Sequence, residues 1–116
     1  MCGIAGFISS EFFGAPQRIS EILVSMTSRL THRGPDGQGI WADDEHGVGL
    51  GHTRLSILDL SEAGSQPMPS SCGRIVMTFN GEIYNADQIR SELQAVGRSF
   101  RGSSDTEVLV EACAEF

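Results

Sequence analysis

Cysteine at position 2 is the residue with the most specific chemical potential in this sequence. Removal of Met1, which aminopeptidases carry out when the second residue is small, would leave the Cys2 thiol beside a free α-amine. Such an amine has a reference pKa of about 7.7 to 8.0 and suits a general base near neutral pH, so one residue would supply nucleophile and base. The alternative is a small buried hydrophobic side chain at the start of a strand, because free cysteine is among the most buried residue types.

Asn80 and Gly81 offer a second piece of chemistry. An Asn-Gly pair after a β-rich run is a strong hairpin signal, so the two residues could form a turn and nothing more. The same pair could instead direct a side-chain amide N–H and an unobstructed backbone N–H at a developing oxyanion. Taken alone, the spacing favours the turn.

Three charged residues could bind a small substrate. Arg54 ends a predicted strand on the face shared with His52, where a guanidinium would either clamp a carboxylate or lie on the surface with its stem covering apolar atoms. Asp105 falls in the first turn of a predicted helix, where the helix dipole favours a carboxylate whatever the function. Glu82 is an ordinary charge beside a turn when taken alone.

Short strands and helices must position these residues. Strands are predicted over 3–9, on both sides of the polar turn at 44–47, and over 74–79, with a brief candidate at 98–100. Gly49 and Gly51 should leave one strand face bare, so that another layer can approach it closely.

Three helices are predicted. The first starts at Pro16, with apolar residues at helical spacing at positions 19, 22, 23, 26 and 30. Asn85 is expected to cap the second, with Gln88 at the capping-box position and Gly97 as its end. Ser104 is expected to cap the third, three residues before Glu107. The apolar face expected of the third helix consists of Val108, Leu109, Ala112, Cys113 and Phe116.

Composition narrows the class of protein. The chain has 116 residues, 40% of them hydrophobic, with 15 acidic against 8 basic residues and a net charge of −7. A phosphate-binding surface needs clustered basic side chains, so nucleic acid and anionic membranes are poor partners for this chain. Three separated cysteines and three single histidines suggest neither a disulfide framework nor a metal site. The sequence has no secretory signal or membrane span, and a cytoplasmic location is expected.

Five separated stretches resemble one family. They are MCGIAGF, THRGPDGQGIW, LGHTRLSILDLSEAGSQPM, FNGEIYN and SSDTEV, in this order. Together they resemble the N-terminal glutaminase domain of asparagine synthetases, which are class II glutamine amidotransferases. The run RLSILDLS followed by NGEIYN is similar to the asparagine synthetase version rather than to that of the sugar-phosphate or purine-pathway amidotransferases.

The resemblance implies an α+β fold of the N-terminal-nucleophile hydrolase type. This is an αββα sandwich of two antiparallel sheets stacked face to face, with helices outside. Residues 1–116 are identified as the N-terminal part of one glutamine amidotransferase type 2 domain, shorter than the family's domain. Later strands of both sheets and the synthetase domain are therefore expected to be absent, and the fragment is expected to be poorly stable alone.

The resemblance also implies roles for particular residues. Cys2 would be the nucleophile that attacks the side-chain amide of glutamine, while Asn80 and Gly81 would form the oxyanion hole. The remaining implied residues bind glutamine through its α-carboxylate, its α-amino group or the pocket lining: Arg54, Leu55, Ile57, Glu82 and Asp105. An amino acid is a zwitterion, so a cation together with carboxylates is the pattern that its recognition needs.

The implied activity is hydrolysis of L-glutamine to glutamate and ammonia. The ammonia would serve ATP-dependent conversion of aspartate to asparagine by an absent C-terminal synthetase domain or chain, which would use ATP and Mg, whereas the glutaminase domain itself needs no cofactor or metal. The resemblance to this family also allows a homodimer. Two alternatives from other classes are a non-catalytic binding module derived from the family and an N-terminal-nucleophile hydrolase that acts on a different amide.

Overall fold

An antiparallel three-stranded sheet carries the N-terminus. The computed structural model describes residues 2–55 and 61–116. Strands β1 (Gly3–Ile8) and β2 (Gly37–Asp43) pair on either side of β3 (Val48–Arg54), in the order β1-β3-β2. The register aligns Gly3 with Thr53 and Ile4 with His52, so alternate residues of β1 and β3 share a face. The turn between β2 and β3 lies at 44–47, as the sequence predicts.

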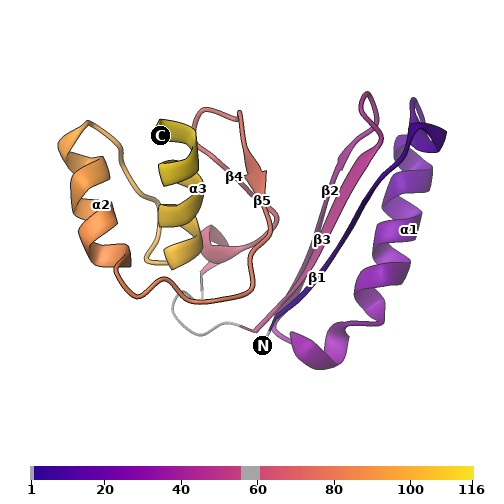
Figure 1. Cartoon of the computed structure of the whole chain (residues 1–116). Coiled ribbons are helices and arrows are strands. Elements are labelled where there is room, and N and C mark those ends of the chain that lie inside the picture. The colour runs from indigo at the N-terminus through magenta and orange to yellow at the C-terminus, as the bar shows by residue number, and fades with distance from the viewer. Residues whose placement is uncertain (1, 56–60) are drawn as a thin grey trace.

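Helix α1 (Pro16–Ser28) covers one face of this sheet (Figure 1). Ile19 and Leu23 of the helix are fully buried against it. The predicted bare face of β3 is confirmed, because a Cβ atom added at Gly51 would lie 2.6 Å from Cγ2 of Thr27. Short 3-10 helices flank α1 at Ser10–Phe12 and Thr31–Arg33. The glycine at position 51 thus allows the side chains of α1 to pack directly on the backbone of β3.

A second, smaller layer follows in the chain. A 3-10 helix (Glu62–Gly64) leads to the two-residue strands β4 (Met68–Pro69) and β5 (Val76–Met77), which pair antiparallel. Helices α2 (Ala86–Ala95) and α3 (Asp105–Glu115) lie on the side of this pair away from the first sheet (Figure 1). The structure is therefore mixed α+β with antiparallel sheets.

Two strand predictions are wrong in this layer. The strand predicted over 74–79 spans only Val76–Met77, since its ladder partner among the described residues, β4, is itself two residues long. Residues 98–100 form no strand. Residues 78–85, which include three predicted site residues, therefore form no strand and make no ladder of backbone hydrogen bonds.

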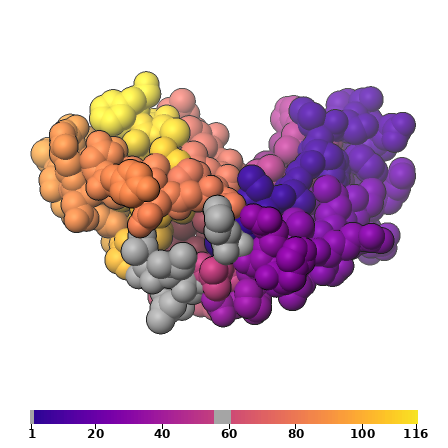
Figure 2. Space-filling model, turned by 60° about the horizontal axis from the view of Figure 1, so that its bottom comes forward, coloured from indigo at the N-terminus to yellow at the C-terminus, as the bar shows by residue number. Residues whose placement is uncertain are grey.

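The face of the first sheet opposite α1 is only partly covered. Ile4 and Ile8 are 49% and 77% exposed, so β1 is not the buried strand that its apolar sequence predicts. Figure 2 shows the surface hollowed between the N-terminal layer, in indigo and purple, and the C-terminal layer, in orange and yellow. The two layers meet near the N-terminal end of β1 and diverge from there.

The helix ends follow the sequence in two of three cases. Gly97, at φ 95°, ends α2, with its N–H donating to Gln94 and that of Arg98 to Leu93, the pattern of a Schellman motif. Ser104 caps α3 by accepting from the Glu107 N–H at 3.2 Å. Asn85 precedes α2 but makes no side-chain cap, so the predicted capping box is wrong. Among the described residues, no helix has the length and apolar content needed to cross a bilayer.

Helix α3 buries carboxylates as well as apolar side chains. Val108, Val110 and Ala114 are buried, and so are Glu107 and Glu111 at 3% exposure, whereas Cys113 and Phe116 of the expected apolar face are exposed. Glu111 accepts from the Ser71 N–H and from Arg98, an arginine beyond the end of α2. Burial raises the pKa of Glu111, but these hydrogen bonds outweigh it and hold the pKa below its ordinary value.

We expect Gly34→Ala to destabilise the fold by about 1–3 kcal/mol. A Cβ atom at Gly34 would overlap the Thr53 carbonyl and the Arg54 nitrogen, which are backbone atoms that cannot turn away. Gly37→Ala is the matched control, because a Cβ there lies 3.8 Å from Cβ of Arg54, an ordinary contact. Urea unfolding of both variants and the parent chain measures the difference, and equal midpoints for the two variants would contradict the packing described.

Candidate active site

The Cys2 sulfur lies against the end of β3. Because β1 and β3 pair antiparallel, the residue before β1 meets the residue after β3. The Leu55 N–H donates to Sγ at 3.2 Å, and the thiol lies 3.7 Å from the Leu55 carbonyl oxygen. Cys2 is half-buried. The structure therefore brings two of the predicted site residues, Cys2 and Leu55, into direct contact.

Residues that the sequence analysis did not assign to the site hold the backbone around Cys2. The Gly3 N–H donates to the Thr53 hydroxyl at 3.1 Å, and that hydroxyl donates to the Leu30 carbonyl. Arg33 Nε donates to the Cys2 carbonyl at 3.4 Å. Thr53 and Arg33 lie inside two of the five motif stretches, in GHTRL and THRGPD. Their place in these stretches is the feature of the sequence that could have indicated a role at the site.

Arg54 shares the sheet face of Cys2 at the adjoining end of β3. Its Nη1 donates to the Ser61 carbonyl at 2.8 Å, and its own carbonyl accepts from the Asp36 N–H at 2.9 Å. Arg54 is half-buried. This burial is compatible with both alternatives from the sequence, a surface arginine and a clamp for a carboxylate. Ile57, the other predicted residue of this stretch, lies outside the described residues.

Asn80 and Gly81 lie in the irregular segment after β5. No strand among the described residues returns from them to pair with β5, and neither residue has the positive φ that a type I′ hairpin turn requires. The hairpin that the sequence favours for this pair is therefore wrong. Asn80 is half-buried and Gly81 exposed, and no hydrogen bond within the described residues joins either to Cys2.

Asp105 connects the start of α3 to the same segment. It is 8% exposed, and its Oδ2 accepts from the Ile83 N–H at 2.8 Å. Glu82, which precedes Ile83, is exposed. The two predicted acidic residues are thus brought together through one backbone contact, in which Asp105 uses one carboxylate oxygen.

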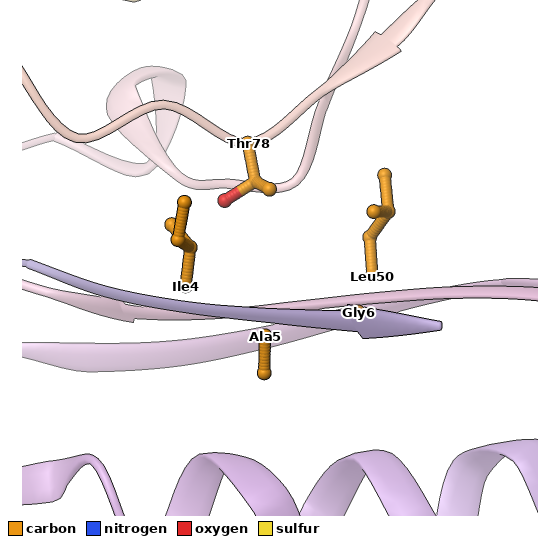
Figure 3. Close-up of a pocket in the computed structure, with 5 residues that line it drawn as sticks. All are labelled: Ile4, Ala5, Gly6, Leu50 and Thr78. Atoms are coloured by element: carbon orange, nitrogen blue, oxygen red, sulfur yellow. The ribbon is translucent and has the colours of Figure 1, made fainter. Parts of the chain in front are cut away.

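A pocket of about 220 Å³ opens beside this arrangement (Figure 3). Its lining residues are Ile4, Ala5, Gly6, Leu50 and Thr78; Ile4 and Leu50 rise from the sheet toward the second layer, and Thr78 points down toward the sheet between them. None of the predicted site residues in the described part of the chain lines it, and its walls are almost entirely apolar. The pocket separates the two layers, and the polar groups that could recognise a substrate lie beyond its rim.

His52 lies between this pocket and Arg54 on β3. The ring is 1% exposed, with Nδ1 and the Thr78 hydroxyl oxygen 2.9 Å apart in a hydrogen bond. Its Nε2 atom is buried and has no hydrogen-bond partner among the residues that the structure describes. Burial, helped by the nearby Arg54 guanidinium, lowers the pKa of His52 to about 4, so the ring is neutral at neutral pH.

Comparison with known proteins shows one family. Residues 1–116 match a family model described as glutamine amidotransferase domain. The chain is 39% identical over 118 residues to asparagine synthetase (glutamine-hydrolyzing) 3 and 42% identical over 110 residues to asparagine synthetase (glutamine-hydrolyzing) 1, both of Bacillus subtilis. It is also 40% identical over 117 residues to the amidase chry2 of Gibberella zeae.

These relatives are much longer than this chain. The alignments include 100% of this chain with the first synthetase and 95% with the second synthetase and with the amidase. They span 18%, 17% and 17% of the relatives, in the same order. The similarity therefore concerns one segment of each relative.

The pKa values of the buried His52 and the exposed His46 should be shifted in opposite directions from the ordinary value for histidine. His46, in the β2–β3 turn, is 2.8 Å from Asp43, and this hydrogen bond raises its pKa above the ordinary value of 6.5. We expect proton NMR titration to find His46 above 6.5 and His52 near 4. Asp43→Asn is the control: it should return His46 toward 6.5 and leave His52 unchanged.

The His52 titration also predicts a loss of stability in acid. An unfolded histidine binds its proton near pH 6.5, while folded His52 resists it until about pH 4. Protonation therefore favours the unfolded chain as pH falls from 6.5 to 4, at a cost that reaches about 3 kcal/mol. Urea unfolding of the parent and His52→Asn chains at pH 7 and pH 4.5 measures this term, and equal losses in both chains would contradict it.

Proposed function

The chain belongs to the glutamine amidotransferase domain family, and from this we propose that it is the glutamine-hydrolysing part of an asparagine synthetase-like enzyme. The observation that carries the proposal is the position of the Cys2 sulfur, held at the end of β3 by the Leu55 N–H and next to Arg54. A thiol at residue 2 in this position can become the N-terminal nucleophile when Met1 is removed.

The first chemical step would be attack by the Cys2 thiolate on the side-chain carbonyl carbon of glutamine. The α-amine of Cys2 takes the thiol proton as the S–C bond forms, and the carbonyl oxygen becomes an oxyanion. Asn80 and Gly81 would donate a side-chain and a backbone N–H to this oxygen. One such donor typically contributes about 3 kcal/mol to the stability of the transition state.

Collapse of this intermediate would break the C–N bond. The α-amine returns its proton to the leaving nitrogen, ammonia departs, and a glutamyl thioester remains on Cys2. Water activated by the same amine then hydrolyses the thioester, which releases glutamate and restores the thiol. Each step uses groups of residue 2, so the chemistry requires neither a metal nor an organic cofactor in this chain.

Recognition of glutamine would use the charges on either side of the nucleophile. The Arg54 guanidinium pairs with the α-carboxylate, and Asp105 with Glu82 holds the α-ammonium group. Asp105 already accepts from Ile83 through Oδ2, so the substrate would bind through Oδ1, for which the described residues provide no hydrogen-bond donor. Leu55 and Ile57 would supply backbone that contacts the bound glutamine.

The remaining elements of the proposal concern the whole enzyme. The two antiparallel sheets and outer helices support an N-terminal-nucleophile hydrolase sandwich, of which residues 1–116 form a part of one domain. A synthetase domain or chain would take the ammonia and use ATP and Mg²⁺ to convert aspartate to asparagine. The synthetase names of the relatives support this acceptor.

The nucleophile can be tested by mass spectrometry. We expect the purified chain to lack one methionine and to gain a single adduct from 6-diazo-5-oxo-norleucine, an electrophilic analogue of glutamine. Cys2→Ala should form no adduct, whereas Cys72→Ala and Cys113→Ala, which remove exposed cysteines, should label as the parent does. Retained Met1 without an adduct would favour a non-catalytic module, and turnover of another amide without glutamine binding would point to a different hydrolase.

Asp105→Asn separates substrate binding from folding. The asparagine side chain keeps an oxygen that accepts from the Ile83 N–H but loses the charge proposed to pair with the ammonium group. We expect KM for glutamine to rise about 10- to 100-fold, the equivalent of a lost charge-assisted hydrogen bond, with kcat nearly unchanged. Steady-state glutaminase assays and a thermal melt measure the two effects, and an unchanged KM would exclude this role.

A further inference from the structure

We propose that His52 and Gln66 are positioning residues for the proposed glutaminase site. Each holds one of the two residues that precede Asn80, and together they fix the oxyanion segment relative to Cys2 and to Asp105. This inference rests on the proposed function for its catalytic meaning and on the hydrogen bonds described below for its geometry.

The segment from Thr78 to Asn85 needs support from other elements. It lies between β5 and α2 and forms neither strand nor helix, so no ladder of backbone hydrogen bonds sets its path. A donor pair aimed at an oxyanion must nevertheless be placed to within a fraction of an ångström. The hydrogen bonds from other parts of the chain must therefore supply the order.

His52 supplies the support from the side of the nucleophile. It lies on β3, two residues before Arg54 and three before Leu55, and its Nδ1 is 2.9 Å from the hydroxyl oxygen of Thr78. The ring is 1% exposed, so water competes little for this bond. Figure 3 shows Thr78 above the sheet, pointing toward β1 and β3. The contact links the sheet that carries Cys2 to the residue two positions before Asn80.

Gln66 supplies the support from the side of α3. Its Oε1 accepts from the Phe79 N–H at 2.6 Å, and its Nε2 donates to the Thr106 hydroxyl at 3.1 Å. One side-chain amide thus joins the residue before Asn80 to the residue after Asp105. The backbone of Gln66 is itself fixed, because its carbonyl oxygen packs against Gly39 so closely that a Cβ atom would overlap it.

Asp105 supports the segment from its other end. Its hydrogen bond to the Ile83 N–H holds the segment on the far side of Asn80 and Gly81. The proposed oxyanion donors are therefore bracketed by supports at residues 78, 79 and 83. Loss of either upstream support would leave the fold intact but allow Asn80 and Gly81 to move relative to Cys2.

Two matched pairs of variants test this. Thr78→Val removes the hydroxyl with almost no change of shape, and Thr78→Ser keeps it. Gln66→Met removes both hydrogen bonds of the amide, and Gln66→Glu keeps oxygens that can accept from the Phe79 N–H and the Thr106 hydroxyl. The parent residues His52 and Asp105 stay in place in all four chains.

The first readout is backbone order, which does not depend on catalysis. We expect ¹⁵N relaxation to give order parameters near ~0.85 for Asn80 and Gly81 in the parent, Thr78→Ser and Gln66→Glu chains, falling below ~0.6 in Thr78→Val and Gln66→Met. Residues of α1 should be unchanged in all chains. Equal order at Asn80 and Gly81 in every chain would overturn the proposal.

The second readout is the rate at which 6-diazo-5-oxo-norleucine labels Cys2. Thr78→Val and Gln66→Met should label about 10- to 100-fold more slowly than the parent, with Thr78→Ser and Gln66→Glu near the parent rate. Parent-like labelling in the disordered variants would overturn the catalytic part of the inference. A parent chain that is never labelled would instead overturn the proposed function, while the relaxation data would still decide whether His52 and Gln66 order the segment.

Discussion

The antiparallel register between β1 and β3 is the constraint on which the rest of the site depends. Continued by one residue, this register sets Cys2 opposite Arg54, the last residue of β3, so that the N–H of the next residue, Leu55, reaches the Cys2 sulfur. The register is enforced on the α1 side, where Thr53 accepts from Gly3 and donates to Leu30. A shift of one residue would turn Cys2 toward the helix and separate it from Arg54, because side chains alternate between the two faces.

The second layer is connected to this sheet mainly by polar contacts. Apolar packing between the layers is incomplete, since Ile4 and Ile8 remain exposed and a pocket separates Leu50 from Thr78. His52 crosses from the sheet to the second layer through its hydrogen bond with Thr78, while Gln66, whose carbonyl oxygen packs against Gly39 of β2, accepts from Phe79 within the second layer. Hydrogen bonds specify direction, whereas apolar contact does not, so a small contact area can still fix the path of the 78–85 segment.

Local patterns predicted much of the fold. Pro16 as the helix start, Gly97 as a left-handed stop, Ser104 as a cap and the bare glycine face of β3 follow from one or two neighbouring residues, and the structure has all four. The burial of α3 was harder to predict. The apolar face expected of this helix includes Cys113 and Phe116, which are exposed, whereas Glu107 and Glu111 are buried because they accept from loop N–H groups that the helical pattern does not include.

The same distinction applies to the candidate site. The motifs named Cys2 and Arg54, and the β1–β3 register brings both to one face of the sheet, but the partners of Gln66 lie 13 and 40 residues away and that of His52 lies 26 residues away. A glutamine in a loop and a histidine in a strand have no local signature of such a role. Their importance becomes visible only when the layers are assembled, since each then satisfies a polar group of an otherwise unsupported segment.

Buried carboxylates on α3 order three loops that pack against it, and one of these loops is the irregular 78–85 segment. Glu107 accepts from the N–H groups of Arg101 and Gly102, Glu111 from Ser71, and Asp105 from Ile83. A carboxylate is costly to bury unless it is hydrogen-bonded, and loop N–H groups without a ladder partner are the donors it needs. Asp105 differs from the two glutamates, because within residues 2–55 and 61–116 only one of its carboxylate oxygens accepts a hydrogen bond. That division allows one residue to order the segment and still offer a charge to an α-ammonium group, so the loop and the substrate would share a single anchor.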